Sequence, residues 1–235
     1  MSNDTPTPPL AVVTGSSQGI GHAIALHLLA QGWRVVGLDL ADATIQAPGF
    51  QALRLDLTDT AQLVHTCQAQ PTPDALVHAA GVLRVGRLDG LDLQAGDLMW
   101  QLHVQAATAL AQAWVPGMAA RGGGRVVLIG SRVAQGMPGR GQYAATKAAL
   151  VALARSWAAE VAPQQVTVNV VSPAATATAM LLDPARAGSR PRLPPSGRYI
   201  DPQEIAQLVA FLLSPAAASI TGQDIAICGG ASLPS

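Results

Sequence analysis

Short β-branched runs and longer helical segments alternate along this chain from Leu10 to its last quarter. Buried parallel strands appear in a sequence as short apolar runs bounded by turn residues, whereas helices follow a period of about 3.6 residues. Parallel neighbours must be joined by crossovers, and crossovers are right-handed, so helices come to lie on both faces of the sheet. The alternation therefore predicts an α/β fold, a doubly wound parallel sheet of the Rossmann-like type.

The expected strands span Leu10–Thr14, Arg34–Asp39, Ala52–Leu55, Ala75–His78, Arg125–Ile129, Val166–Val171 and Ile225–Ile227. The expected helices span Gly19–Gln31, Asp59–Gln68, Leu98–Met118 and Gln142–Val161, and a further helix opens at Asp201, with Pro202 and Glu204 forming its start signal.

One domain is expected over residues 10–235, because the chain contains no internal repeat and no low-complexity linker. Residues 1–9 lack a basic segment followed by an apolar one, so they are interpreted as a short disordered leader and not as a signal peptide. Residues 172–200 are rich in Pro, Gly and Arg and show little periodicity. Since periodic structure resumes beyond them, we expect a substrate lid over about 175–200.

The chain is poor in charge, and this excludes several partners. Its 14 basic and 14 acidic side chains cancel, and charged residues make up 12% of the sequence against about 25% in an average domain. A net charge of zero provides no field for nucleic acid or an anionic bilayer, and 3% aromatic residues provide few stacking platforms. No apolar stretch reaches the roughly 18 residues of a membrane span. We therefore expect no nucleic-acid and no membrane partner.

The two cysteines, Cys67 and Cys228, lie too far apart for a metal motif, and one pair is no disulfide framework. The sequence thus favours a reducing, cytoplasmic location and no metal site.

A glycine-rich turn, T-G-S-S-Q-G-I-G, closes the first strand and begins a helix at Thr14–Gly21. Its glycines permit a tight turn and a close approach of the backbone to a pyrophosphate, and the helix N-terminus favours an anion. Asp39, at the end of the second strand, is positioned to accept hydrogen bonds from an adenosine ribose and to repel a 2′-phosphate. This favours NAD over NADP. The alternatives are a loop that binds nothing and an ordinary acid that caps a turn.

Two further strand ends carry weaker signals for the same cofactor. Asp56 is placed to meet the adenine edge, although its type and position are equally those of a turn or cap residue. The H-A-A-G segment at His78–Gly81 lets backbone approach a cofactor, but small residues also serve close packing of strand on helix.

The reactive groups are expected in Ser131, Tyr143 and Lys147. Tyr143 and Lys147 are four residues apart on a helix and therefore share a face. A phenol has a pKa near 10, but an adjacent ammonium and a nicotinium charge both favour its phenolate. Tyr143 then removes a hydroxyl proton while hydride leaves the carbon, and Ser131 holds the substrate oxygen. The alternative for Tyr143 taken alone is a surface aromatic side chain.

The glycine-rich turn, Ser131 and the Y-A-A-T-K of Tyr143–Lys147 together resemble the short-chain dehydrogenase/reductase family, over essentially residues 10–233. Within that family, the segments D-A-L-V-H-A-A-G-V-L-R-V-G, N-V-V-S-P-A-A-T-A-T-A-M and I-T-G-Q-D-I-A-I-C-G-G resemble 2,3-dihydro-2,3-dihydroxybenzoate dehydrogenases of catechol siderophore biosynthesis. The resemblance implies a homotetramer or dimer, NAD as cofactor, and catalysis by Ser131, Tyr143 and Lys147. The cofactor contacts implied by the resemblance are Gly15, Ser17, Gln18, Gly19, Ile20, Gly21, Asp39, Asp56, Leu57, Ala79, Ala80, Gly81, Tyr143, Lys147, Pro173, Thr176 and Thr178.

Three departures from the family pattern concern the same site. His103 replaces the usual catalytic Asn, which puts the proton relay of that Asn in doubt. Because a histidine also donates and accepts, His103 can substitute for the Asn and is a fourth candidate catalytic residue. His78 replaces the Asn of N-A-A-G, and Ala174 replaces the Gly of Pro-Gly. Two nearby histidines raise a metal hypothesis, but no carboxylate or thiol cluster completes a ligand set.

Arg84, which follows the H-A-A-G turn, is the candidate for binding a substrate carboxylate, against the alternative of a surface salt bridge. The lid arginines, Arg186, Arg190, Arg192 and Arg198, are interpreted first as a solvated basic loop and second as a carboxylate or phosphate site.

The leading hypothesis is an NAD-dependent oxidoreductase acting on a small cyclic secondary alcohol or diol, with 2,3-dihydro-2,3-dihydroxybenzoate as the substrate that the resemblance specifies. One alternative is an NADP-dependent carbonyl reductase of the 3-oxoacyl type. Another is a cofactor-binding scaffold with impaired catalysis, a possibility raised by the three departures.

Overall fold

A computed structural model of the chain describes residues 7–183 and 192–233. It contains a seven-stranded parallel sheet in the order β3-β2-β1-β4-β5-β6-β7. The strands are β1 (Leu10–Thr14), β2 (Arg34–Asp39), β3 (Phe50–Arg54), β4 (Ala75–His78), β5 (Gly124–Ile129), β6 (Val166–Pro173) and β7 (Asp224–Ile227). The helices are α1 (Gly19–Ala30), α2 (Thr60–Gln68), α3 (Leu93–Trp100), α4 (Ala106–Ala120), α5 (Gly141–Val161) and α6 (Pro202–Leu213).

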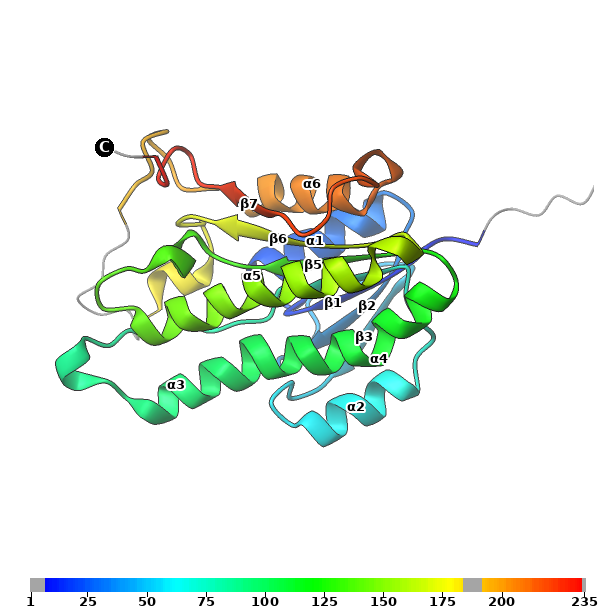
Figure 1. Cartoon of the computed structure of the whole chain (residues 1–235), viewed down its shortest axis with the longest axis horizontal. Helices are drawn as coiled ribbons and strands as arrows, with labels where there is room; N and C mark the ends of the chain where they lie inside the picture. Colours follow the sequence, from blue (N-terminus) through cyan, green and yellow to red (C-terminus); the bar gives the residue numbers. More distant parts are fainter. Residues whose placement is uncertain (1–6, 184–191, 234–235) are drawn as a thin grey trace, which may run out of the picture.

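The sheet lies between two helical layers (Figure 1). α1 and α6 pack against each other on one face, and α2, α4 and α5 cover the other. Along β1, Ala11 and Val13 pack into the core between the sheet and α1 and α6. Leu10 and Val12 pack into the core on the other face, against α2, α4 and α5. Strands buried on both faces must be apolar at every position, which is why they appeared as continuous runs in the sequence. The doubly wound parallel fold is confirmed.

The strand order reverses between β1 and β4. The chain runs outward through β2 and β3 and then returns to place β4 on the other side of β1, with Thr14 opposite His78 in the register. Ligands of open α/β sheets bind outside the carboxyl ends of the strands at such a reversal. The topology therefore brings the glycine-rich turn after β1 next to the H-A-A-G segment that ends β4.

The helix expected over Leu98–Met118 was wrong in its bounds and its continuity. Helical structure begins at Leu93, where the Asp92 side chain accepts a hydrogen bond from the Ala95 amide at 3.1 Å. A π-helical turn, Gln101–Gln105, then separates α3 from α4. Such turns insert one residue into an α-helix and are frequent at functional sites. The expectation failed because one inserted residue barely disturbs a 3.6-residue pattern.

The bounds of the third strand and the start of α6 were also predicted from the sequence. The third strand was expected at Ala52–Leu55, but β3 begins two residues earlier and ends one residue earlier, at Phe50–Arg54. The start signal of α6 is confirmed, because the Asp201 carboxylate accepts from the Gln203 amide and Glu204 closes a capping box on the Asp201 amide.

The expected lid falls only partly within the described residues. Thr176 pairs with Ile200 in an isolated parallel bridge, and a 3₁₀ turn follows at Ala179–Leu182. Residues 184–191, with Arg186 and Arg190, lie outside the described ranges, as do residues 1–6 of the expected leader. Within the ranges described, no helix is both long enough and apolar enough to traverse a bilayer.

Candidate functional site

The sequence-predicted site residues gather at one edge of the sheet. Thr14, Asp39, His78, Ile129 and Pro173 are the last residues of β1, β2, β4, β5 and β6. The carboxyl ends of parallel strands lie along the same edge, so the segments that follow these five residues adjoin one another.

The glycine-rich turn is held against the end of β4. Gly15 has φ +69°, and a Cβ placed on it would lie 2.9 Å from the Cα of Ala80. A Cβ on Gly21 would collide with the carbonyl oxygen of Gly15. The turn therefore requires glycine at both positions. Gly15 has a left-handed backbone and lies close to Ala80, and Gly21 packs against the backbone of the turn itself.

The start of α1 is open to an anion. Within the described part of the chain, the N-cap Gln18 makes no side-chain capping bond, and the first turn holds no acidic residue. The helix N-terminus thus offers amide donors and the positive end of its dipole. Gly19 faces the segment after β6, where a Cβ on it would lie 3.5 Å from the methyl group of Thr178. These features fit the pyrophosphate of a dinucleotide.

Asp39 braces the same turn. One carboxylate oxygen accepts from the Ser17 amide and the other from the Ala41 amide, both at 2.9 Å. The side chain also lines a cleft of about 110 Å³ between the turn and β3. Each oxygen keeps a second lone pair. Capping the turn and accepting from a ribose diol are therefore compatible roles, although the sequence posed them as alternatives.

Arg54 is the one cation among the described residues that line this cleft. It lies opposite Asp39 in the register of β2 and β3. Its guanidinium donates to the Leu40 carbonyl oxygen and to the Asp42 carboxylate, each at 3.0 Å. The cleft thus presents an acid and an arginine that already has a carboxylate partner.

Asp56 and Leu57 have ordinary local roles in the structure. One Asp56 oxygen accepts from both the amide and the hydroxyl of Thr58, and Leu57 is buried. Asp56 therefore caps a turn, which is the alternative that the sequence left open.

Ser131, Tyr143 and Lys147 stand beside the end of β5. Ser131 is buried and caps a 3₁₀ turn at Arg132–Gln135 by accepting from the Val133 amide at 3.2 Å. Tyr143 and Lys147 occupy one face of α5, as their spacing predicted, and the Lys147 ammonium nitrogen lies 5.7 Å from the centre of the Tyr143 ring.

Lys147 is the only lysine in the sequence, and it is buried. Its Nζ donates to the Ile129 carbonyl oxygen at 2.8 Å. Burial penalises the charged form and lowers the pKa of the ammonium from 10.5 to about 7. The group next to the Tyr143 phenol therefore changes charge near neutral pH.

The two histidines that depart from the family pattern are both buried at this site. His78 contacts Thr14 and the backbone of Leu102, while His103 contacts Val82 and Thr146. Sequence reasoning missed both threonines. Their only signal was position, since Thr14 opens the glycine-rich turn and Thr146 lies between Tyr143 and Lys147. Within residues 7–183 and 192–233, no three His, Cys, Asp or Glu side chains gather as a metal site requires.

Arg84 is engaged by its own chain. Its guanidinium lies 3.7 Å from the Asp183 carboxylate and donates to the Leu83 carbonyl oxygen, with about a third of each charged side chain exposed. The salt bridge that the sequence posed as the alternative is thus formed. Arg198 is likewise paired, with both of its terminal nitrogens on Glu204. Arg192 is exposed.

The segment after β6 is fixed through its backbone. Ala174, which follows Pro173, donates its amide to the Ile227 carbonyl oxygen, and the Thr176 hydroxyl donates to the Ala174 carbonyl oxygen. An alanine therefore fits this turn.

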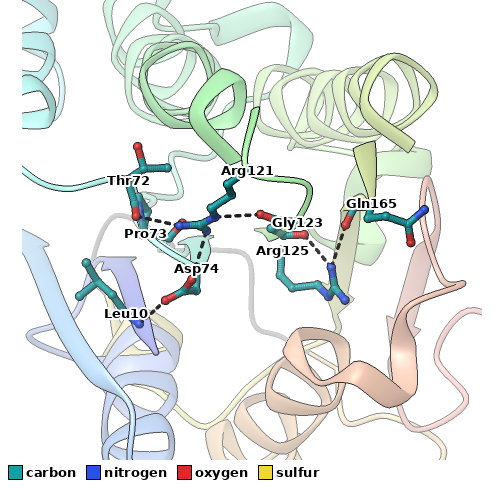
Figure 2. Close-up of polar contacts among 9 residues, drawn as sticks. Leu10, Thr72, Pro73, Asp74, Arg121, Gly123, Arg125 and Gln165 are labelled. Atoms are coloured by element: carbon teal, nitrogen blue, oxygen red, sulfur yellow. Dashed lines mark hydrogen bonds and ion pairs between the residues drawn. The ribbon is translucent and has the colours of Figure 1, made fainter. Parts of the chain in front are cut away.

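A cleft of about 300 Å³ lies at the opposite edge of the sheet, where the strands begin. Figure 2 shows its polar wall. Arg121 donates to the carbonyl oxygens of Thr72, Pro73 and Gly123 and forms an ion pair with Asp74, while Arg125 donates to the carbonyl oxygen of Gln165. These contacts fasten the segments that enter β4, β5 and β6. The cleft is far from Ser131 along β5, so we assign it a structural role.

Comparison with known proteins identifies similar sequences over nearly the whole chain. A family model described as Enoyl-(Acyl carrier protein) reductase matches residues 15–232. The 3-oxoacyl-[acyl-carrier-protein] reductase FabG of Escherichia coli (strain K12) is 36% identical over 239 residues, which cover 94% of this chain and 96% of the relative. The 2,3-dihydro-2,3-dihydroxybenzoate dehydrogenase of the same organism is 37% identical over 238 residues, with the same coverage of both chains.

Solved structures agree with the fold. A short chain dehydrogenase/reductase family protein superposes with a TM-score of 0.88 at 34% identity, covering 96% of this chain and 98% of the other. The aldohexose dehydrogenase of Thermoplasma acidophilum in ligand-free form gives a TM-score of 0.88 at 26% identity, covering 97% and 95% of the two chains.

Proposed function

Because this chain belongs to the short-chain dehydrogenase/reductase family, and so to a class of nicotinamide-dependent oxidoreductases, we propose that it uses NAD to oxidise a cyclic secondary alcohol or diol. The observation that carries this proposal is the position of Ser131, Tyr143 and Lys147 at the sheet edge that also holds the glycine-rich turn. The substrate proposed is 2,3-dihydro-2,3-dihydroxybenzoate, whose oxidation yields an aromatic ring. The 37% identity with the dehydrogenase of that compound supports this choice.

The chain's own residues supply a site for the dinucleotide. The turn at Gly15–Gly21 and the start of α1 receive the pyrophosphate, and Asp39 receives the adenosine ribose. Asp39 supports NAD over NADP, because its carboxylate repels a 2′-phosphate and the nearby Arg54 is paired with Asp42. When bound, the nicotinamide supplies the hydride acceptor.

The remaining proposed contacts with the dinucleotide come from three strand ends. Asp56 and Leu57 adjoin the adenine, Ala79, Ala80 and Gly81 line the middle of the cofactor, and Pro173, Thr176 and Thr178 border the nicotinamide.

Three side chains move the proton and hold the substrate. The Tyr143 phenolate accepts the proton of the substrate hydroxyl as the hydride leaves the carbon that bears this hydroxyl. The Lys147 ammonium lowers the free energy of that phenolate and is oriented by the Ile129 carbonyl oxygen. Ser131, buried beside the end of β5, donates to the substrate oxygen and fixes its distance from Tyr143.

Arg84 is the proposed partner of the substrate carboxylate. It must exchange its 3.7 Å contact with Asp183 for the substrate, since both side chains are about one third exposed. Exposed ion pairs contribute little free energy, about 0–1 kcal/mol, so a bidentate carboxylate can replace Asp183 at small cost.

A second candidate function is reduction of 3-oxoacyl thioesters with NADP. The 36% identity with a 3-oxoacyl-[acyl-carrier-protein] reductase over 94% of this chain favours it. Asp39 opposes it, because the candidate requires a 2′-phosphate beside that carboxylate.

A two-cofactor assay separates the candidates. The protein is mixed with 2,3-dihydro-2,3-dihydroxybenzoate, or with cyclic secondary alcohols, in the presence of NAD or NADP, and the absorbance of the reduced nicotinamide is followed. In the reverse direction, acetoacetyl thioester is supplied with NADH or NADPH. We expect turnover of the diol with NAD. Turnover of the thioester with NADPH and none of the diol would favour the second candidate.

Tyr143→Phe is the control for catalysis. It removes the group that accepts the proton, and we expect kcat to fall by about 100-fold to 10,000-fold while NAD still binds. Unchanged turnover in this variant would remove Tyr143 from the mechanism.

A further inference from the structure

Two buried histidines, one at the end of β4 and one in the π-helical turn, form hydrogen bonds that leave each ring a single arrangement. His78 is 1% exposed and His103 is fully buried. The proposed proton transfer from the substrate hydroxyl to Tyr143 uses neither residue. Their protons can nevertheless be located by counting the donors and acceptors around each ring.

The proton of His78 is located by Thr14. The Thr14 hydroxyl accepts from the Ala79 and Ala80 amides, each at 3.0 Å, and lies 3.0 Å from Nδ1 of His78. A hydroxyl has one proton and two acceptor lone pairs, so the two amides leave its proton for Nδ1. The His78 ring therefore carries its hydrogen on Nε2, which donates to the Leu102 carbonyl oxygen at 3.2 Å.

The same counting gives His103 the opposite tautomer. Its Nε2 accepts from the Val82 amide at 3.0 Å. Its Nδ1 lies 2.8 Å from the Thr146 hydroxyl, which donates its only proton to the Tyr143 carbonyl oxygen at 2.8 Å. Nδ1 must therefore be the donor to Thr146.

Neither ring has room for a second proton. A proton added at Nδ1 of His78 would displace the Thr14 hydroxyl proton, and one added at Nε2 of His103 would face the Val82 amide hydrogen. The ionisable groups closest to these rings are Lys147, Tyr143 and each other. Burial and the charge of Lys147 lower the pKa of His78 to about 3 and the pKa of His103 well below 6.5.

His103 contacts the reacting groups from the side. Its ring meets the Tyr143 ring edge to face, with centroids 5.6 Å apart and planes at 87°. A Cβ on Gly81 would lie 3.0 Å from Nε2 of His103 and 3.6 Å from Nζ of Lys147. The Gly81 backbone is therefore packed beside both side chains, and the ring of His103 sets how close that backbone comes to α5.

We propose that His103 and His78 are uncharged positioning residues and do not relay protons. His103 joins the backbone after the H-A-A-G segment to α5 through Val82 and Thr146. His78 joins the π-helical turn to the glycine-rich turn through Leu102 and Thr14. The pair thus fixes the spacing between the proposed cofactor turn and the Tyr143 helix, a role that rests on the proposed function.

The tautomers can be measured without any substrate. The full chain, labelled with ¹⁵N-histidine, contains five histidines, and His78→Asn and His103→Asn assign the two buried rings. We expect both rings to stay uncharged from pH 5 to 9, with hydrogen on Nε2 in His78 and on Nδ1 in His103. Titration of either ring in this range, or an Nε2–H tautomer at His103, would overturn the proposal.

Kinetics then separate positioning from proton relay. His103→Asn offers the same kinds of group, one acceptor and one donor on a single side chain, whereas His103→Leu offers neither. We expect kcat to fall by about 100-fold in the leucine variant, the scale of loss for a small misplacement, and to recover to within about 10-fold of wild type in the asparagine variant. Both limbs of the pH profile should stay in place. The exposed His65, changed to Asn, is the matched control and should leave kcat unchanged.

A shifted limb of the pH profile in His103→Asn would favour a relay. If wild type turns over none of the substrates tested, the proposed function fails, while the ¹⁵N tautomers still decide the arrangement of the pair.

Discussion

At the scale of single residues, burial of Lys147 lowers the stability of the folded protein, although the proposed mechanism uses its charged ammonium. Burial costs its ammonium solvation, and the Ile129 carbonyl oxygen is the hydrogen-bond acceptor that the structure assigns to it. The cost of burying this ammonium depends on pH. Between pH 7 and 10.5 the unfolded chain holds a proton on this lysine that the folded chain has lost, so this group makes stability rise with pH across that window. Below pH 7 both states hold the proton, and the full penalty remains.

The pKa of Lys147 can be measured directly, since the chain has one lysine. Protein grown with ¹³C-labelled lysine should give one side-chain signal that titrates near pH 7 in the cofactor-free state. A midpoint near 10.5 would show that water reaches the amine and that burial of Lys147 costs little free energy.

Lys147→Met tests the energetic side. We expect this variant to lose activity and yet, at pH 6, to gain about 1–3 kcal/mol in free energy of unfolding, because a buried charge is replaced by an apolar group. Urea unfolding at pH 6 and pH 9.5 is the measurement. The gain should shrink at pH 9.5, where wild type has lost the proton in its folded state. A variant less stable than wild type at both pH values would contradict the prediction.

At the scale of elements, the turns after β1 and β4 depend on each other. Gly15 lies against the backbone of Ala80, and Thr14 accepts from the amides of Ala79 and Ala80. The end of β1 is therefore fastened to the segment after β4 by two hydrogen bonds and one backbone contact. Backbone atoms cannot move aside as a flexible side chain can, so a methyl group at Gly15 must separate the two turns.

Gly15→Ala should accordingly destabilise the protein and weaken cofactor binding together. We expect a loss of about 2–4 kcal/mol in free energy of unfolding, from the positive φ and the contact with Ala80, and at least about a 10-fold weaker NAD affinity. Gly123→Ala is the matched control, since a Cβ there meets no atom of the described structure within 4 Å and φ is not positive. Chemical denaturation and NAD titration provide the two readouts. If the two variants had equal free energies of unfolding and equal NAD affinities, the two turns would not depend on each other.

At the scale of the whole molecule, the low charge concerns the outer face of α5. The exposed positions of α5 are Gly141, Ala145, Ala148, Ala152, Arg155, Ser156, Ala159 and Glu160, so those up to Ala152 carry no charge. On α3, Leu98 and Trp100 are 37% and 44% exposed. Such surface fits the homotetramer that the family resemblance implies, because subunit interfaces are depleted in charge at their cores.

Ala148→Glu tests this assembly. We expect wild type to sediment as a tetramer at micromolar concentration, and the variant to sediment as a smaller species because a buried charge is added to the interface. Ala61→Glu, on the exposed first turn of α2, is the control and should leave the assembly unchanged. A wild-type monomer in sedimentation velocity would contradict the prediction that α5 forms a subunit interface.

The sequence predicted the fold more fully than the site. All seven strands and the capping box of α6 were located to within a residue or two, because strand and cap signals are local. The π-helical turn at Gln101–Gln105 was missed, since the insertion of one residue is nearly invisible in a hydrophobic period. The carboxylate of Asp183 beside Arg84 was missed as well, because the two are 99 residues apart and no pattern connects them.

By itself the sequence determined the parallel sheet, the family, and the shared face of Tyr143 and Lys147. Periodicity and spacing express these features within a few residues of chain. Only the tertiary structure decided that Lys147 is buried with a pKa near 7 and that His78 and His103 are uncharged with opposite tautomers. A side chain's charge depends on the water it loses and on the partners it gains. For these residues the partners come from other elements, and folding alone brings them together.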